Sequence, residues 1–359
     1  MLPPVTQDSL PRELGGPFRA ALLLASLVVI VAGMRAAAPV LTPLALAGFV
    51  AAVSFPMVSA LRARGVRPSL AIVATVLVDA LIVSAFASIV VETVADLRVQ
   101  LPVYLSRGQA LEAAARARLE TWGIVLPPEF YGSLIQPQRL IDYVTIAARN
   151  ITSWLTLVFL LLLYLVFILT EAVLLPEKVR HVLGPDAGAI TVGSAVLRQV
   201  QRYLAVKTLI SLLTGIAIGT GAALLGVDFA AFWGLLAFAL NYIPNIGSII
   251  AAVPAVLVAL LQLGAQRSVA LAMVYLVVNI LLGNIADPIL IGRHLRLSPI
   301  VVLVSLVFWG WTWGIIGAFL AVPLTITLRV ALQSSERWGR LAALMGPVDT
   351  TAARVAPDP

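Results

Sequence analysis

Long apolar runs alternate with short polar connections along most of this chain. A helix that crosses the hydrocarbon core of a membrane needs about 20 largely apolar residues. Several uninterrupted runs approach or exceed that length, and each predicts a spanning helix: Phe18–Met34, Ala37–Leu61, Leu70–Val91, Ile151–Leu175, Ala205–Leu225 and Ser268–Ile285. The pattern is therefore typical of a membrane protein built from helices.

Two further apolar stretches are interrupted. Phe229–Leu263 is broken at Asn241–Gly247, and Pro299–Leu332 is broken at Gly310–Gly317. Each arm covers roughly 18–24 Å of helix, which is short for a hydrocarbon core of about 30 Å. Each stretch is either two thin spans or one re-entrant hairpin, and both alternatives return the chain to the side it entered from. Together with the uninterrupted runs, they predict an all-α, polytopic membrane protein with about eight membrane-inserted helical segments.

Composition supports the same class. Of the 359 residues, 61% are hydrophobic and only 11% are charged, against about a quarter charged in soluble domains. The net charge of +7 could suggest nucleic acid, but the basic residues are scattered through short connections and form no basic face. The partner that the sequence predicts is therefore the lipid bilayer, and not nucleic acid.

The basic residues also predict the orientation. Lys and Arg concentrate in the cytoplasmic loops of membrane proteins. With a cytoplasmic N-terminus, only Arg35 and Arg267 fall in the short outer connections, and most of the 24 Lys and Arg lie inside. We therefore expect a multi-pass protein of the cell membrane with both termini cytoplasmic and segment 96–150 outside.

These features divide the chain into six parts. Segment 96–150 is the one sizeable polar insertion, and its apolar residues recur at helical spacing, which predicts short amphipathic helices outside the membrane. The expected parts are membrane helices over 1–95, the extramembrane insertion 96–150, a membrane helix over 151–175, a cytoplasmic amphipathic segment 176–204, a transport core with two hairpins over 205–332, and a cytoplasmic tail 333–359.

The sequence argues against an enzyme. Lys207-Thr208 resembles the end of a nucleotide-binding P-loop, but that motif needs glycines where this chain has Gln201 and Val206. The chain has no cysteine and only two histidines, so a thiolate or multi-histidine metal site is not expected. We expect no cofactor, no metal and no ATP.

The two interruptions are candidate sites for a solute. In the first, Pro244 removes an amide donor and Gly247 permits a left-handed exit, while Asn241 and Asn245 add side-chain amides. Transporters use such breaks because helix ends and bare carbonyls can bind substrates and ions. An ordinary surface loop between two spans is the alternative.

The second interruption carries Gly310, Gly314 and Gly317 among three tryptophans. Small residues allow helices to approach closely. The tryptophans are either an interfacial belt or a platform for a substrate.

Polar residues inside the apolar segments are further candidates. Asp79 lies near the middle of its span, and Asp287 ends another, directly before Pro288. Ionisable residues within a membrane are functional candidates by default, although Asp79 could instead make a polar packing contact. Lys207 and Glu171 are expected to reach water by snorkelling. Asn279 and Asn284 add hydrogen-bonding groups to the path.

Residues 196–331 resemble the autoinducer-2 exporter family of membrane transporters. The resemblance rests on phrases that occur in the family's order: Arg198–Leu204, Asn241–Gly247, Ala252–Val256, Asn284–Gly292, Leu297–Pro299, Trp311 with Gly314 and Gly317, and Leu320–Leu324. One departure is Asp287-Pro288, where the family often has Glu-Pro. Aspartate keeps the negative charge of that position on a shorter side chain.

The resemblance implies eight membrane-inserted segments, cytoplasmic termini and homo-oligomers. It also implies export of autoinducer-2 in some members and Na⁺(Li⁺)/H⁺ exchange in others. The sequence therefore leaves three alternative functions: export of a small polar solute by alternating access, monovalent cation/proton antiport, and a membrane scaffold that transports nothing and acts through segment 96–150.

Overall fold

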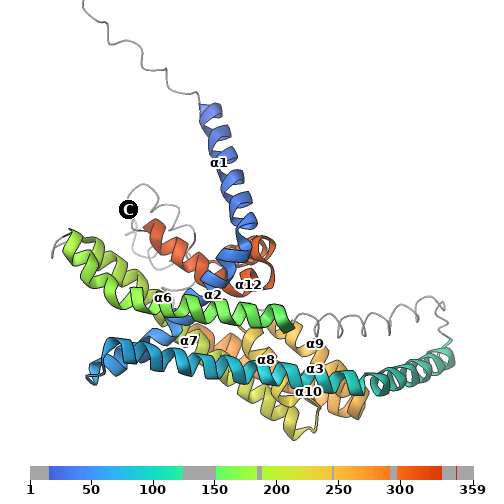
Figure 1. Cartoon of the computed structure of the whole chain (residues 1–359). Helices are drawn as coiled ribbons and strands as arrows, with labels where there is room; N and C mark the ends of the chain where they lie inside the picture. Colours follow the sequence, from blue (N-terminus) through green and yellow to red (C-terminus); the bar gives the residue numbers. More distant parts are fainter. Residues whose placement is uncertain are drawn as a thin grey trace, which may run out of the picture.

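The computed structural model describes residues 16–123, 151–183, 188–244, 246–291, 297–333 and 345. Within these residues the regular structure is entirely helical (Figure 1). The elements are α1 (Gly16–Ala36), α2 (Ala38–Ala63), α3 (Pro68–Thr121), α6 (Ile151–Leu183), α7 (Gly188–Leu224), α8 (Ala230–Leu240), α9 (Ile246–Leu263), α10 (Ala265–Val278), the π-helix η1 (Asn279–Ala286), α11 (Asp287–Ile291) and α12 (Pro299–Gln333). The prediction of an all-α fold is confirmed.

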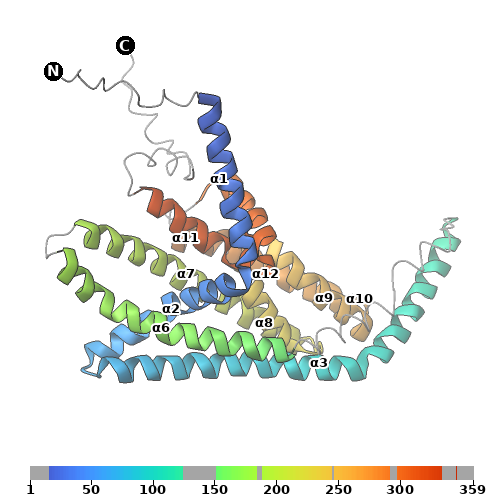
Figure 2. The ribbon, with the colours of Figure 1, turned by 45° about the horizontal axis from the view of Figure 1, so that its top comes forward.

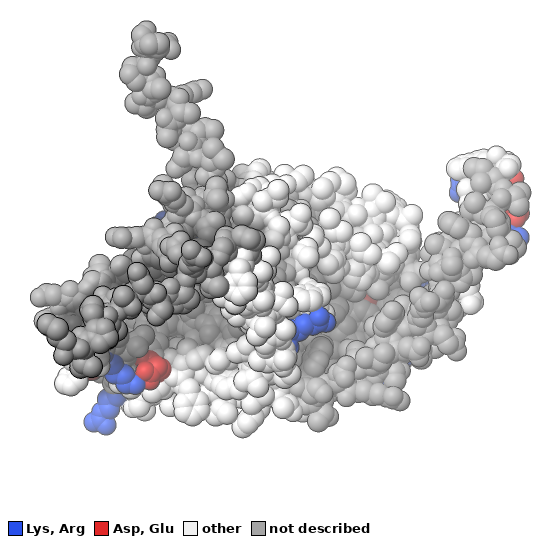
Figure 3. All heavy atoms as spheres, turned by 90° about the horizontal axis from the view of Figure 1, so that it is seen from above, with Lys and Arg blue, Asp and Glu red and all other residues white. Residues whose placement is uncertain are grey.

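Most of these helices suit a membrane. Among the described residues, 7 helices are long and apolar enough to cross one, and α1 and α8 are shorter apolar helices. Among the described side chains seen in Figure 3, few are charged, and large apolar side chains such as Leu81 and Phe167 are exposed on the helices. Such a surface is stable in lipid, where apolar exposure has no hydrophobic cost. The chain is a multi-pass membrane protein, as the sequence predicts.

The first interrupted stretch is a hairpin formed by α8 and α9. The turn is tight, because a Cβ atom at Gly247 would overlap the carbonyl oxygen of Leu240. With 11 residues, α8 extends over about 16 Å. Its tip lies beside the middle of α7, where the hydroxyl of Tyr242 donates a hydrogen bond to Thr208 Oγ1 at 2.7 Å. The position of this tip inside the membrane remains a prediction.

The second interrupted stretch is also a hairpin, although its two arms together form the single element α12. Gly314 has a non-helical backbone (φ 66°, ψ −146°) that reverses the chain. The two arms then run side by side: a Cβ atom at Gly317 would overlap the carbonyl oxygen of Trp309, and Trp309 Nε1 donates to Thr325 Oγ1 at 3.2 Å. Both interruptions predicted from the sequence therefore reverse the chain.

Helix α3 differs from its prediction. It continues without a break from Pro68 to Thr121, so residues 96–121 are not the separate short helices that we expected. Figure 2 shows this helix extending beyond the rest of the bundle and bending in its distal part. Tyr104 and Arg107 of α3 still contact the bundle: they donate hydrogen bonds to Asp228 Oδ2 at 2.6 Å and to the Gln262 carbonyl at 2.9 Å. Residues 124–150, the remainder of the insertion, lie outside the described residues.

Helix α7 holds the α8–α9 hairpin in place. It is continuous from Gly188 to Leu224, so the expected boundary at 204/205, between the amphipathic segment and the following span, falls inside one helix. Gly215 of α7 and Gly234 of α8 face each other so closely that a Cβ on either would lie 2.7 Å from the other's carbonyl oxygen. A separate cluster, with Val58, Ile72 and Leu165 at its centre, joins α2, α3 and α6. The α8–α9 hairpin is thus fixed against α7.

Candidate functional site

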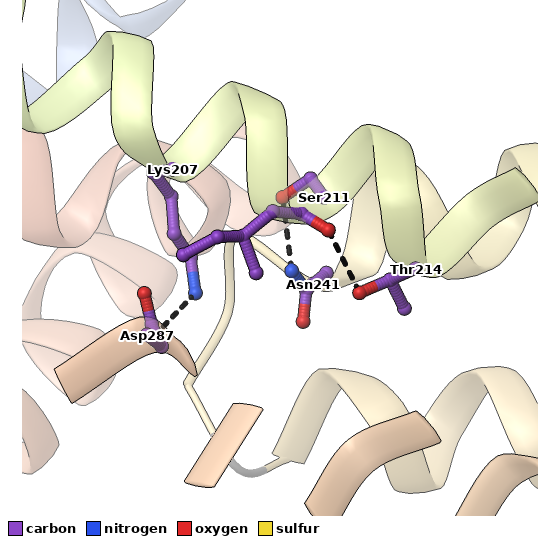
Figure 4. A network of polar contacts seen from close by, with 6 residues as sticks. Lys207, Ser211, Thr214, Asn241 and Asp287 are labelled. Carbon is purple, nitrogen blue, oxygen red and sulfur yellow. Dashed lines mark hydrogen bonds and ion pairs between the residues drawn. The ribbon is translucent and has the colours of Figure 1, made fainter. Parts of the chain in front are cut away.

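A buried ion pair links α7 to α11. Lys207 Nζ lies 3.1 Å from Asp287 Oδ2, and the two side chains are 5% and 22% exposed (Figure 4). Burial of two charges is tolerated because each compensates the other. The second carboxylate oxygen, Asp287 Oδ1, is buried and has no hydrogen-bond partner within the described ranges. The pair therefore retains one acceptor for a further donor or cation.

The ion pair borders a polar cavity of about 50 Å³. Three segments enclose it: α7, the tip of the α8–α9 hairpin, and the η1–α11 region. The lining residues are Lys207, Asn241, Ile243, Pro244, Ser248, Asn279, Gly283, Asn284 and Asp287. A water molecule needs about 10–15 Å³ of such space, so the cavity in this conformation has room for a few water molecules.

Hydrogen bonds to α7 hold the hairpin tip over the cavity. Asn241, which directly follows α8, donates from Nδ2 to Ser211 Oγ at 3.0 Å (Figure 4). The adjacent Tyr242 is bound to Thr208 one turn earlier on α7. The turn itself is closed by backbone hydrogen bonds, since Ile243 N donates to the Leu240 carbonyl at 2.9 Å and Gly247 N to the Ile243 carbonyl at 3.1 Å. The tip is thus a polar surface fixed in an apolar surrounding.

The opposite wall is an unusual helix. Residues Asn279–Ala286 form a π-helix, a wide helix with i→i+5 hydrogen bonds that is rare and frequent at functional sites. A Cβ atom at Gly283 would lie 2.9 Å from Asn279 Oδ1. The glycine therefore leaves space for the Asn279 amide one turn away, and both residues line the cavity.

The structure brings together some of the candidates predicted from the sequence. Asn241, Pro244, Asn279, Asn284 and Asp287 all line the cavity. Others lie near it without lining it. Gly247 closes the hairpin turn, and Pro288 follows Asp287 in the first turn of α11. Asn245 lies outside the described residues.

The remaining candidates lie elsewhere. Asp79 is between α2 and α3, where Ser54 Oγ donates to its Oδ1 at 2.8 Å. Its Oδ2 is buried without a hydrogen-bond partner among the described residues. This carboxylate therefore makes a polar contact in the α2–α3 packing, and it is not part of the cavity.

The glycines of the second hairpin, Gly310, Gly314 and Gly317, do not line the cavity either. An aromatic contact nevertheless connects the two hairpins, since the rings of Tyr242 and Phe319 are 4.7 Å apart, centroid to centroid. Movement of either hairpin must therefore be accommodated by the other at this contact.

Sequence analysis missed several residues of the cavity. The expectation that Lys207 reaches water by snorkelling is wrong, because its side chain is buried against Asp287. Ser248 and Gly283 also line the cavity. One basic and one acidic residue in two different apolar segments are the sequence feature from which the Lys207–Asp287 pair could have been predicted. Nothing in the sequence places Ser248 beside them, because only the hairpin turn does so.

Comparison with known proteins identifies the family. The model of the family described as AI-2E family transporter matches residues 24–337. The chain belongs to the AI-2E transporter family. Two proteins of Escherichia coli (strain K12) are similar along nearly their whole length. The "Putative transport protein YhhT" is 34% identical over 91% of this chain and 93% of its own. The "AI-2 transport protein TqsA" is 34% identical over 91% of this chain and 95% of its own.

A similar protein also occurs in another bacterium. A "Putative transport protein" of Haemophilus influenzae is 32% identical over 92% of this chain and 97% of its own. The family and the apolar helices together make this chain a membrane transporter. The matched range contains all three segments that enclose the cavity, so the cavity belongs to the part of the chain that the family shares.

Proposed function

We propose that this transporter exports a small polar solute, similar to AI-2, by alternating access, and that the solute binds in the cavity beside Lys207 and Asp287. The observation that carries the proposal is the cavity itself. Side-chain amides, a serine hydroxyl and an ion pair with one unused oxygen converge on it from three segments. Such groups suit a hydroxylated solute, because hydroxyls both donate and accept hydrogen bonds.

The size of the cavity and its cover support alternating access. The volume of about 50 Å³ is too small for a solute with several carbon atoms. The tip of the hairpin, at Asn241 and Pro244, forms one wall. The hairpin tip or η1 must therefore move before such a solute enters. In transporters, broken helices near the membrane centre are the segments that bind the substrate between such movements.

Na⁺(Li⁺)/H⁺ antiport is the second candidate function, and the buried ion pair favours it. A cation could replace the Lys207 ammonium at Asp287, and the carboxylate could take a proton on the return. Asp79 is a second buried carboxylate with the same capacity. A scaffold role without transport is the third alternative, and the absence of any flux would favour it.

Flux measurements on purified protein in lipid vesicles test these functions together. We expect vesicles with the wild-type protein to move synthetic AI-2 faster than empty vesicles, with no dependence on a Na⁺ or Li⁺ gradient. Proton release driven by Na⁺ or Li⁺, without AI-2 movement, would replace the exporter with the antiporter. No flux of AI-2, small polyols or cations would contradict both transport functions.

A charge-neutral pair of substitutions separates the first two functions more sharply. Asp287→Asn alone leaves Lys207 buried without a counter-charge, which destabilises the fold. A loss of flux in this variant could then come from unfolding as well as from a lost function. The double variant Lys207→Met, Asp287→Asn avoids this. An exporter of a neutral solute should retain part of its AI-2 flux in the double variant, because the side-chain amides and Ser248 remain in the cavity wall. An antiporter should lose all ion exchange.

The orientation and assembly of the chain are proposals of the same kind. We propose cytoplasmic termini, an extracellular segment 96–150, and homo-oligomers. Because the chain has no cysteine, single cysteines at Ser106 and Ser335 give a clean test with an impermeant thiol reagent on intact cells. We expect labelling at position 106 and none at 335, and the reverse would rule out this orientation. The mass of the protein in detergent tests the assembly.

A further inference from the structure

A second, smaller cavity with a mixed polar and apolar lining adjoins the first. Its volume is about 10 Å³, and it is lined by Thr214, Ile218, Ala237, Asn241, Ser248, Tyr275, Val278 and Asn279. Asn241, Ser248 and Asn279 line both cavities. These shared residues form the boundary between the two cavities, and a group that passes the Asn241 side chain leaves one cavity for the other.

The two cavities are arranged along α7. Thr214 lies seven residues beyond Lys207, which is about 10 Å along a helix. Along the facing helices α10 and α11 the chain runs in the opposite sense. Tyr275 lines the second cavity, and Asp287, which comes later in the chain, lines the first. Further on, Val274 of α10 lies against Gly221 of α7. The second cavity is therefore the next position on a route that starts at the ion pair and follows α7 toward Leu224.

One side chain of the second cavity lacks a hydrogen bond. Tyr275 is only 6% exposed, and its hydroxyl has no partner within the part of the chain that the structure describes. A buried hydroxyl without a partner is costly. Thr214, across the cavity, donates its proton to the Ile210 carbonyl at 2.9 Å, so its oxygen can only accept a further hydrogen bond. The cavity thus presents one unused hydroxyl and one unused acceptor.

The lining also limits what can bind there. The second cavity contains amides and hydroxyls, and no residue that lines it is charged. A bare cation bound there would have no carboxylate to balance its charge. A neutral hydroxyl group needs only one donor and one acceptor, and Tyr275 and Thr214 supply these.

We propose that Tyr275 belongs to a second solute subsite, in which its hydroxyl binds a hydroxyl group of the solute after the solute has passed Asn241. This subsite rests on the proposed export function. It makes Tyr275 a specificity-determining residue for hydroxylated solutes, with Asn241 as the boundary between the first and second positions of the solute.

The variant Tyr275→Phe tests the subsite, because it retains the ring and removes only the hydroxyl. AI-2 flux is measured in lipid vesicles against concentration. The loss of one hydrogen bond to the solute should raise KM by roughly tenfold, while the amount of folded protein stays unchanged. The matched control is Tyr164→Phe on α6, outside both cavities, which should behave as wild type. An unchanged KM in Tyr275→Phe would overturn the subsite, even though export itself is observed.

A second measurement remains decisive if the wild-type protein moves no solute. In that case the export proposal fails, but the route can still be tested. Single cysteines replace Tyr275 or Tyr164 in the cysteine-free chain, and each is labelled with a small water-soluble methanethiosulfonate reagent. If position 275 lies on a polar route, it should react at least tenfold faster than position 164. Equal, slow labelling at both positions would overturn the route as well.

Discussion

The two hairpins begin from similar sequence features and have different surroundings. Both are apolar stretches interrupted near a glycine that contacts a carbonyl of the preceding arm, at Gly247 and at Gly317. The α8–α9 tip contacts α7 through polar side chains and covers the polar cavity. The α12 turn instead carries tryptophans, and Trp313 Nε1 donates to the Met34 carbonyl of α1 at 3.2 Å. Figure 2 shows α1, next to α12, extending away from the bundle.

This difference teaches that a break in a membrane helix does not by itself make a binding site. Near the first tip, Asn241, Ser248 and the facing Asn279 supply polar groups, and the buried charges of Lys207 and Asp287 lie beside them. The second turn has indole rings, which pack and anchor helices. The polar residues beside the break therefore decide which hairpin borders a polar cavity.

The largest expected effect concerns the charge pair beneath the first hairpin. Asp287→Asn leaves the Lys207 ammonium buried without its partner, and it should lower the free energy of unfolding by about 3 kcal/mol. The double variant Lys207→Met, Asp287→Asn should recover most of that loss. Thr325→Val, which removes a hydrogen bond inside α12, should cost about 1 kcal/mol. Denaturation in detergent micelles measures all three, and equal losses in the single and double variants would contradict the pairing.

The second comparison concerns the glycines. Gly247→Ala and Gly317→Ala each place a methyl group against a backbone carbonyl, so each should destabilise the protein by roughly 2–3 kcal/mol. Gly310→Ala is the matched control, because its nearest neighbour is the Ala318 Cβ at 3.6 Å. We expect no loss there. Thermal unfolding in detergent is the measurement, and a stable Gly247→Ala protein would show that the turn is looser than described.

A smaller effect should separate transport from stability. Asn241→Ala removes the bond to Ser211 and a wall of both cavities, so AI-2 flux should fall about tenfold while stability falls by about 1 kcal/mol. Trp313→Phe, in the second hairpin, should lower stability to a similar extent and leave the flux unchanged. Parallel flux and denaturation measurements distinguish the two. Similar flux losses in both variants would remove the distinction between the hairpins.

The smallest expected effect is at the contact between the hairpins. Phe319→Leu replaces one ring of the pair with Tyr242 and should cost about 0.5–1.5 kcal/mol. Since α12 lines neither cavity, KM for AI-2 should not change. Leu320→Ile, one residue away and buried, controls for general changes in packing. A large rise in KM in the Phe319 variant alone would mean that the second hairpin shapes the site through Tyr242.

Much of the fold could be predicted because lipid imposes a simple rule. Apolar runs of membrane length become helices, as in α2 and α6, and the glycine-containing breaks at Gly247 and Gly314 reverse the chain. The extent of α3 could not be predicted in this way. Segment 96–121 is polar and amphipathic, which fits a separate surface helix as well as an extension of the span, and no residue marks an end near position 95.

The site could be predicted only in part, for a different physical reason. Asn241, Asn279 and Asp287 are polar residues in apolar surroundings, and such residues are conspicuous in a sequence. Their partners are not. Lys207 is separated from Asp287 by 80 positions, and its burial depends on packing between helices that are distant in the chain. Tyr275 is one of several tyrosines, and only the structure shows that its hydroxyl lacks a partner.

The π-helix has a consequence for the geometry of the ion pair. Each wide turn contains more residues than an α-turn, so η1 can become α-helical if the chain slips by one residue. In an α-helix one residue corresponds to a rotation of about 100° and a rise of 1.5 Å. Asp287 directly follows η1, and such a slip would rotate its carboxylate away from Lys207 without unfolding either neighbouring helix. The charges beneath the hairpin can therefore be separated by a change of helical register, with both hairpin tips held in place.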